Sequence, residues 1–231
     1  MLDMDTIITK RMTSTWFELL QLNDATFPIG SYSFSWGLET FVQQGIIHDE
    51  QSTALYIESE LETSFLYSEL FTVRLAWEYS AFPEKLSELN EIYGASRSPF
   101  ELRDGSRKLG ARFVKTTSSF AEEKPEEDLS AGSLFFPVAY GAYCAARNIP
   151  LEDVLSSFLY SQTSARITTC VKLVPLSQTS GQQLLFKFIQ KFPHLLEKCM
   201  QLSKDDLCRC APGIDIRAMQ HEFLYSRLYS N

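Results

Sequence analysis

Residues 98–113 read SPFELRDGSRKLGARF and contain the clearest helix-start signal in the chain. Ser98 is placed to cap a helix, Pro99 to occupy its first position, and Glu101 to complete a capping box. The apolar residues that follow at helical spacing are Leu102, Leu109 and Phe113. This stretch therefore predicts a helix with one buried face.

Helical patterns continue on both sides of this stretch. Upstream, Ile57, Leu61 and Phe65 recur at four-residue steps, and Ser52 is a candidate cap for their helix. Downstream, residues 151–159 keep helical spacing closely. These stripes predict long amphipathic helices whose apolar faces must pack on one another.

The remaining downstream segments are also best interpreted as helices. Residues 134–147 are apolar, and small residues such as Gly141 would let a second helix approach closely. Residues 168–174 are rich in β-branched side chains and could form a strand, but their helical neighbours favour a helix. Thr179 and Gln182 are candidate caps for the helix that follows.

The whole chain predicts an all-α fold. We expect about nine or ten helices and find no convincing period-two alternation, so helix-on-helix packing is the architecture that buries the stripes. We expect residues 1–231 to form one compact multi-helix domain. Its predicted irregular parts are a flexible N-terminus at about 1–13, an acidic linker at about 121–129 and a partner-binding tail at about 211–231.

Composition excludes several classes of protein. The chain has 231 residues and a formal net charge of −8. Nucleic acids and anionic membranes bind clustered Lys and Arg, so this charge argues against both as partners. No run reaches the roughly 18 apolar residues that a membrane-spanning helix needs. Residues 1–10 lack the basic-then-apolar order of a signal peptide, so we expect a cytoplasmic protein.

Motifs for catalysis are missing. Residues 105–110, GSRKLG, approach a phosphate loop, but Ala111 and Arg112 follow where Lys and a hydroxyl residue are required. Residues 33–37, SFSWG, lack the first glycine of a nucleophile elbow. With three histidines in the chain, a catalytic triad is also disfavoured. We predict no catalytic and no cofactor-binding residues, although a small helical enzyme with an unrecognised site remains a third hypothesis.

The cysteines are weak candidates for a metal-binding site. Five cysteines lie scattered in the C-terminal half, and an odd number argues against a disulfide framework. Cys208 and Cys210 form a Cys-x-Cys pair, with Cys199 and His194 upstream. Thiolates suit borderline metals, but structural zinc sites space their cysteines differently and add a second pair. We therefore predict no metal site, with Cys208 and Cys210 as the weak candidates for a metal-binding chaperone.

Aromatic residues gather in two segments. Tyr32, Phe34 and Trp36 lie in a glycine-punctuated stretch near the N-terminus. The apolar and arginine residues near the C-terminus are Phe223, Leu224, Tyr225, Arg227, Leu228 and Tyr229. Aromatic residues and Arg dominate interface hot spots, whereas chain ends are normally polar and frayed. Two interpretations follow: the tail folds back on its own core, or it docks on a partner.

Ordered blocks along the chain resemble the UreF family of urease accessory proteins. The blocks are residues 19–24 (LLQLND), 27–33 (FPIGSYS), 37–40 (GLET), 108–113 (KLGARF), 137–141 (PVAYG), 174–178 (VPLSQ), 219–222 (MQHE) and 224–228 (LYSRL). Among family members, the sequences of these blocks are most similar to those of epsilonproteobacterial proteins.

The resemblance implies a role. UreF proteins are all-α, form homodimers, bind the accessory protein UreD (UreH in some organisms) and recruit the GTPase UreG. The assembly inserts nickel into the urease apoprotein. Nickel and GTP are handled by the partners, so the resemblance implies no cofactor bound directly by this chain and no enzymatic activity of its own.

The resemblance also implies residue roles. Tyr32 and Arg227 would help to form the surface that meets the GTPase, and Lys172 would lie on the same face. His221, Leu224 and Tyr225 would order against the UreD-type partner.

This sequence departs from the family at four positions. Phe34, Phe135 and Phe136 stand where many relatives carry histidine, and Trp36 stands where many carry a smaller aromatic residue. The departures argue against metal handling through these positions and leave the scaffold role intact.

Overall fold

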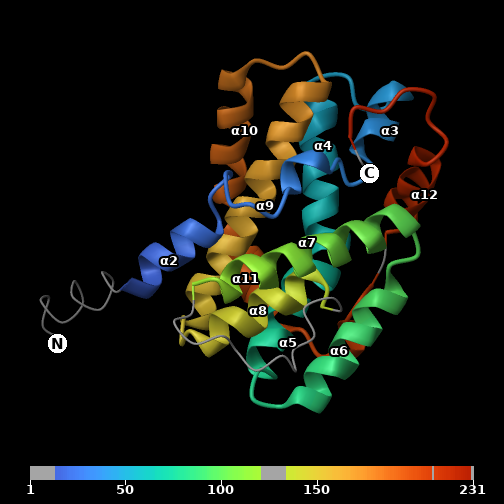
Figure 1. Ribbon diagram of the computed structural model, residues 1–231. Helices are drawn as coiled ribbons and strands as arrows, with labels where there is room; N and C mark the ends of the chain where they lie inside the picture. The colour runs from blue at the N-terminus through green and yellow to red at the C-terminus, as the bar shows by residue number, and fades with distance from the viewer. Residues whose placement is uncertain (1–13, 121–133, 210, 230–231) are drawn as a thin grey trace, which may run out of the picture.

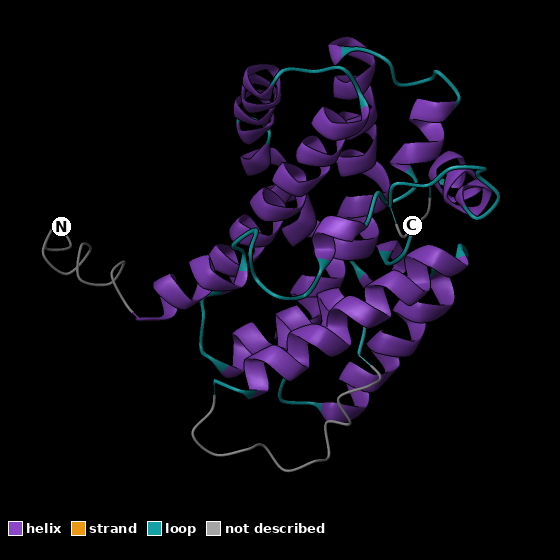
Figure 2. Ribbon diagram, turned by 45° about the horizontal axis from the view of Figure 1, so that its top comes forward, coloured by secondary structure: helices purple, strands orange, loops and turns teal. Residues whose placement is uncertain are grey.

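The computed structural model describes residues 14–120, 134–209 and 211–229, and all structural statements below concern these residues. The predicted N-terminal segment and the predicted acidic linker lie outside them. The described residues form helices joined by loops and contain no strand (Figures 1 and 2). The helices are α2 (Ser14–Leu22), η1 (Ser31–Ser33), α3 (Leu38–Gln43), α4 (Glu50–Glu60), η2 (Leu61–Leu70), α5 (Phe71–Glu78), α6 (Pro83–Ser96), α7 (Phe100–Ser118), α8 (Phe136–Ala146), α9 (Leu151–Leu173), α10 (Gln178–Ile189), α11 (Phe192–Gln201), η3 (Lys204–Asp206) and α12 (Pro212–His221).

The predicted helix number is confirmed. Helices α4, η2 and α5 follow one another without a break, so residues 50–78 form one long rod whose middle part, η2, is a π-helix. Counting that rod once, the described chain has ten helices besides the two short 3₁₀ turns. Residues 168–173 belong to α9, which confirms the helical interpretation of the β-branched segment. None of the described helices combines the length and the apolar character needed to cross a bilayer.

The core is built around α5, α8 and α9. α8 packs on both α5 and α7, and its aromatic side chains meet Phe113 and Phe158. Gly141 permits the closest approach: a Cβ there would collide with the carbonyl oxygen of Val73 and lie 2.9 Å from the Cβ of Ala76. The predicted close contact at Gly141 is therefore confirmed, and α5 is its partner.

Figure 1 places α2 on one side of the molecule and α3 with α12 on the opposite side. The last described residues run beside α3. The N-terminal aromatic segment leads into the same helix, so both aromatic segments lie next to α3. This side contains the candidate site described below.

Three of the predicted helix caps are wrong, those of α7, α4 and α10. α7 begins at Phe100, and its N-cap is Pro99 in extended conformation with no side-chain cap, so Ser98 lies one residue too early. Glu101 contacts the C-terminal tail instead of capping. In α4 the N-cap is Asp49, and Ser52 is its partner three residues later: Asp49 Oδ1 accepts from the Ser52 amide at 2.7 Å.

The cap of α10 is Ser177, and the predicted Thr179 and Gln182 lie inside the helix. The amide of Ser180 donates to Ser177 Oγ at 2.9 Å. Replacing Ser177 with alanine leaves that first-turn amide without its acceptor, and we expect about 1 kcal/mol less free energy of unfolding. Thr179→Ala is the matched control, and it should change stability by less than about 0.5 kcal/mol. Equal effects of the two variants in urea denaturation would contradict the assignment.

Candidate interaction site

A buried histidine joins the C-terminal tail to two helices. His221, the last residue of α12, lies between the carboxylates of Glu39 on α3 and Glu101 on α7. Its Nε2 is 3.2 Å from Glu39 Oε2, and its Nδ1 is 2.6 Å from Glu101 Oε2. Gly37 allows this packing because a Cβ there would lie 3.1 Å from the Cα of Ala218 on α12. The side chain of His221 is fully buried.

The same two carboxylates hold the tail, Glu39 through backbone amides and Glu101 through the Arg227 side chain. The amide of Leu228 donates to Glu39 Oε1 at 2.8 Å, and the amide of Tyr229 donates to Glu39 Oε2 at 3.2 Å. The guanidinium of Arg227 donates to Glu101 Oε1 at 2.9 Å. Hydrogen bonds to charged acceptors are roughly twice as strong as neutral ones, so these contacts fix the path of the tail.

The side chains of the tail nevertheless face outward. Gln43 Nε2 adds a backbone contact, donating to the carbonyl of Ser226 at 2.8 Å. The exposed fractions are 86% for Phe223, 106% for Tyr225 and 77% for Leu228, whereas Leu224 is half-buried. The two sequence interpretations thus combine: the backbone folds back on α3, and the large apolar side chains remain accessible.

The N-terminal aromatic segment forms a loop in which one aromatic side chain is largely exposed to solvent. Tyr32 lies in η1 and is 75% exposed. Gly30 precedes η1 with φ of 78°, a left-handed conformation that glycine adopts without strain. A Cβ on Gly30 would collide with Arg112, whose guanidinium donates to the carbonyl of Ile29 at 3.1 Å. The loop is therefore anchored on α7.

The far end of this loop is anchored in the core. Trp36 is buried, its ring stacks on Phe34 with centroids 5.7 Å apart, and the guanidinium of Arg166 lies 5.4 Å from the Trp36 ring. Trp36 has φ of 58°, and Gly37 has φ of 83° before α3 begins. The exposed Tyr32 and the buried Glu39 are thus positioned by one continuous segment.

The other predicted partner residues differ in their exposure to solvent. Lys172 is exposed in the last turn of α9. Burial raises the pKa of Tyr229, and the neighbouring Thr169 on α9 lowers it. The tail therefore reaches the end of α9 that carries Lys172. His221 is buried, so in this conformation it cannot touch a partner and can act only through the residues that it holds.

The three phenylalanines at family histidine positions serve packing. Phe34 stacks on Trp36, and Phe135 meets Tyr93 with ring centroids 5.3 Å apart. Phe136 is buried among the core aromatics. That these positions do not handle metal remains a prediction.

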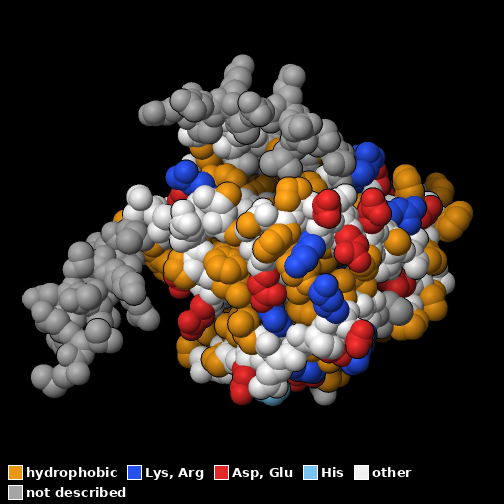
Figure 3. Space-filling model, turned by 90° about the horizontal axis from the view of Figure 1, so that it is seen from below, with side chains coloured by type: hydrophobic (Ala, Val, Ile, Leu, Met, Phe, Trp, Pro, Cys, Tyr) orange, Lys and Arg blue, Asp and Glu red, His pale blue; other side chains and the backbone are white. Residues whose placement is uncertain are grey.

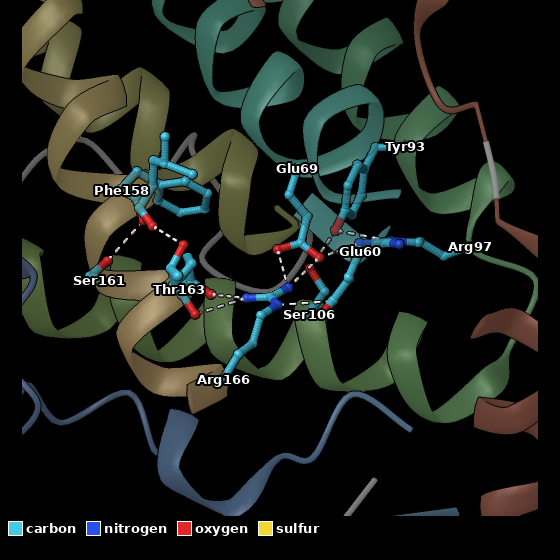
Figure 4. Close-up of polar contacts among 11 residues, drawn as sticks. Glu60, Glu69, Tyr93, Arg97, Ser106, Phe158, Ser161, Thr163 and Arg166 are labelled. Atoms are coloured by element: carbon cyan, nitrogen blue, oxygen red, sulfur yellow. Dashed lines mark hydrogen bonds and ion pairs between the residues drawn. The ribbon is translucent and has the colours of Figure 1, made fainter. Parts of the chain in front are cut away.

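A second polar cluster lies in the core (Figure 4). Arg166 Nε donates to Glu60 Oε1 at 2.8 Å, and its NH2 lies 3.3 Å from Glu69 Oε2. Arg97 donates to Glu69 Oε1 at 2.6 Å and to the hydroxyl of Tyr93 at 3.2 Å. Glu60 precedes the π-helix η2, and Glu69 lies within it. Two guanidinium groups and two carboxylates therefore neutralise one another out of water.

Burial opposes these charges, and their pairing stabilises them. Desolvation lowers the pKa of Arg166, but Glu60 and Glu69 raise it above its ordinary value overall. The pKa of Arg97 is also raised, against desolvation, by Tyr93 and Glu69. The cluster offers no exposed group, so we assign it to holding α6, α9 and η2 together. No sequence motif predicted this cluster; the available signal is Glu60, which lies next to the Ile57–Leu61 stripe of its helix.

The cysteines do not form a recognisable metal site where they are described. Cys199 is fully buried, and burial raises its pKa to about 12. Cys208 is half-buried with φ of 60°, and burial raises its pKa too. Metals bind thiolates, so both shifts weaken these residues as ligands. No group of three potential ligands gathers within the described ranges. Cys210 lies outside those ranges.

Comparison with known proteins identifies the family. The family model for UreF matches residues 47–189, which is more than half of the chain. This chain belongs to the UreF family. A urease accessory protein UreF from Actinobacillus pleuropneumoniae serotype 3 (strain JL03) is 34% identical over 222 residues, covering 91% of this chain and 96% of the relative.

Two further relatives support the assignment. The UreF of Haemophilus influenzae (strain PittEE) is 34% identical over 223 residues, covering 91% of this chain and 93% of the relative. The UreF of Nostoc sp. (strain PCC 7120) is 30% identical over 217 residues, covering 93% and 95% respectively. The predicted UreF resemblance is confirmed, while the special likeness to epsilonproteobacterial members stays a prediction. The matched range of the UreF family model includes neither the Tyr32 loop nor the tail, so the geometry of these two segments has to be argued from this structure.

Proposed function

We propose that this chain is a non-catalytic scaffold in urease maturation. It binds a UreD/UreH-type accessory protein, recruits the UreG-type GTPase and works as a cytoplasmic homodimer on the urease apoprotein. Nickel and GTP are bound by the partners rather than by this chain. Membership of a family of urease accessory proteins supports the general role.

The tail is the observation that carries the proposal. Its backbone is hydrogen-bonded to Glu39 and its Arg227 side chain to Glu101, while Phe223, Tyr225 and Leu228 extend into solvent. Large apolar side chains on an ordered backbone are the usual anchors of a protein interface, because little conformational freedom remains to be lost on binding. This arrangement favours a protein partner for the tail.

Charge adds little to this choice of surface. Figure 3 shows acidic, basic and hydrophobic side chains interspersed on the face seen from below. A mixed face of this kind does not produce the single-sign field that steers nucleic acid or a membrane toward a protein. The proposed interfaces rest on the exposed side chains of the tail and on the exposed Tyr32.

The alternative of a metal-binding chaperone gains no support from the described residues. Cys199 lies in the core, and burial raises the thiol pKa of both Cys199 and Cys208. A thiol that resists deprotonation is a poor ligand for nickel or zinc. We therefore retain the scaffold role as the single proposed function.

Co-expression with the cognate UreD-type and UreG-type proteins tests the proposal. Size-exclusion chromatography with light scattering should show a ternary complex for the wild type. Tyr32→Ala and Arg227→Ala should weaken retention of the GTPase at least about tenfold, as loss of an interface hot spot does. The measured quantity is the mass of the eluting complex at a series of protein concentrations.

Two matched variants control for general surface effects. Tyr160→Ala removes another exposed tyrosine, and Arg107→Ala removes another half-exposed arginine that pairs with a carboxylate. Both should retain the full complex. The scaffold proposal fails if folded wild-type protein binds neither partner. The residue assignment fails if Tyr32→Ala and Arg227→Ala behave like their controls.

A further inference from the structure

The rod made of α4, η2 and α5 changes its hydrogen-bond register in the middle. At the end of α4 the amide of Leu61 donates to the carbonyl of Ile57, four residues back. At the end of η2 the amide of Phe71 donates to the carbonyl of Leu66, five residues back. After η2 the α-helical pattern returns in α5. The rod therefore contains extra backbone within η2 that a continuous α-helix would not need.

A π-helix of this length needs a specific cause. π-helices are rare, and most are single turns inserted in α-helices, frequently at functional sites. η2 is ten residues long, and most of its side chains are buried. Its sequence, LETSFLYSEL, contains neither Gly nor Pro. The cause therefore has to lie in the contacts that the side chains of the rod make.

The spacing of Glu60 and Glu69 supplies such a cause. The two glutamates are nine residues apart in the sequence. Nine residues make about two and a half turns of an α-helix, which would place the two carboxylates on opposite sides. In the structure both meet Arg166 of α9: its Nε is 2.8 Å from Glu60 Oε1, and its NH2 is 3.3 Å from Glu69 Oε2 (Figure 4). The wider turn of the π-helix brings both carboxylates to the α9 side of the rod.

The contacts of Arg166 with Glu60 and Glu69, called here the Arg166 bridge, lie out of water. The exposed fractions of the three side chains are 2%, 5% and 10%. The ring of Phe65 adds an apolar cover, with its centroid 4.9 Å from the guanidinium. Arg97 balances the second carboxylate by donating to Glu69 Oε1 at 2.6 Å. A buried carboxylate that loses its counter-ion is strongly disfavoured, so the bridge opposes any register in which Glu69 faces elsewhere.

Apolar packing fixes one end of the rod more firmly than the other. Val73 and Ala76 of α5 lie directly against Gly141 of α8, and most of α5 is buried. Removing the extra residue from the rod would turn α5 by about 100°, the rotation of one α-helical residue, and would break this contact. The outer face of α4 is exposed, as the 61% exposed Leu55 shows. The extra backbone can therefore move toward α4 without disturbing α5.

We propose that the Arg166 bridge holds the π-helical segment at residues 61–70, and that without the bridge this segment moves toward α4. The three bridge residues are positioning residues, because they act on the register of the rod. The rod is then an element with more than one register, and α9 selects one of them through Arg166. The inference goes beyond the proposed function, and its test needs no partner protein.

A charge-balanced double variant tests the bridge. Arg166→Met combined with Glu60→Gln removes one positive and one negative charge and leaves the pair of Glu69 with Arg97 in place. Apolar replacement of buried ion pairs is often neutral for stability, so we expect this variant to fold. The variant separates the register from the charge balance of the core.

The acceptor of the Phe71 amide reports the register. A crystal structure shows this acceptor, and NMR couplings across hydrogen bonds identify it in solution. In the wild type it should be the carbonyl of Leu66. In the double variant it should be the carbonyl of Tyr67, four residues back, because the π-helical segment has moved away. A folded double variant in which Leu66 remains the acceptor overturns the proposal.

A second charge-balanced pair on the same rod is the matched control. Arg74→Met combined with Glu78→Gln removes an ion pair of α5 that lies outside η2. This variant should keep Leu66 as the acceptor of the Phe71 amide. If the control changes the acceptor as the double variant does, the register responds to any loss of an ion pair on the rod, and the proposal is rejected.

Arg166→Lys keeps the proposal testable if the double variant does not fold. Lysine retains the buried positive charge but lacks the planar fork that reaches two carboxylates. We expect both registers to be populated, with the η2 amides broadened by exchange on the μs–ms timescale of helix register shifts. Amides in the middle of α9 should stay sharp. Sharp η2 amides with Leu66 as the sole acceptor in Arg166→Lys would contradict the bridge.

Discussion

Replacing Arg166 with alanine should lower the free energy of unfolding by about 3–5 kcal/mol, the range measured when one partner of a buried ion pair is removed. Arg166 is the only guanidinium in contact with Glu60 among the described residues, and it shares Glu69 with Arg97. Its removal leaves a carboxylate inside the core without a counter-ion. Urea denaturation followed by circular dichroism measures the loss.

Two comparisons sharpen this experiment. Arg166→Lys keeps the charge but not the planar fork that reaches both carboxylates, so its loss should lie between those of the wild type and Arg166→Ala. Lys191→Ala breaks the half-exposed pair with Glu58 and should change stability by no more than about 1 kcal/mol. An Arg166→Ala protein as stable as Lys191→Ala would show that the core cluster is not closed as described.

Replacing Gly110 with alanine should cost about 1–3 kcal/mol of unfolding free energy, because the added methyl group overfills a closed contact. Gly110 lies on α7 against the backbone at the start of α8. A Cβ there would collide with the carbonyl of Leu134 and lie 2.9 Å from the amide nitrogen of Phe136. Backbone atoms cannot rotate away as a side chain can, so α7 and α8 must separate.

Gly213 provides the matched control for Gly110. A Cβ on Gly213 meets nothing within 4 Å, and its φ is not in the left-handed region. Gly213→Ala should therefore be neutral or stabilise the protein by up to about 1 kcal/mol through the unfolded chain. Urea midpoints of the two variants at equal slope measure the difference. Similar stabilities for both variants would contradict the close α7–α8 contact.

The two aromatic segments are connected by α3. The Tyr32 loop leads directly into this helix, and the tail is hydrogen-bonded to Glu39 on it. Arg166 adds a link from the core to the loop through Trp36. A partner that contacts both Tyr32 and the tail would therefore meet two surfaces whose backbones are fixed by a common element.

The sequence could predict the helices because their signals are local. An apolar stripe such as Ile57, Leu61 and Phe65 needs only the helix period to be recognised, and residues 168–173 continue the helix of their neighbours as expected. The ordered blocks likewise identified the UreF family. The sequence could also exclude a phosphate loop at residues 105–110. The lysine and the hydroxyl residue that such a loop requires are adjacent in sequence, so their absence is visible without the fold.

Tertiary structure alone decided the use of the charged side chains. Glu101 suits a capping box by spacing, yet its carboxylate pairs with His221 and Arg227, which lie more than a hundred residues away along the chain. His221 was predicted to lie at a partner surface. It is buried instead, because the fold places its ring between Glu101 and Glu39. Glu60 meets Arg166 only because α4 and α9 pack together. A local pattern fixes which face of a helix is apolar, whereas the partner of a buried charge depends on which distant helix the fold brings beside it.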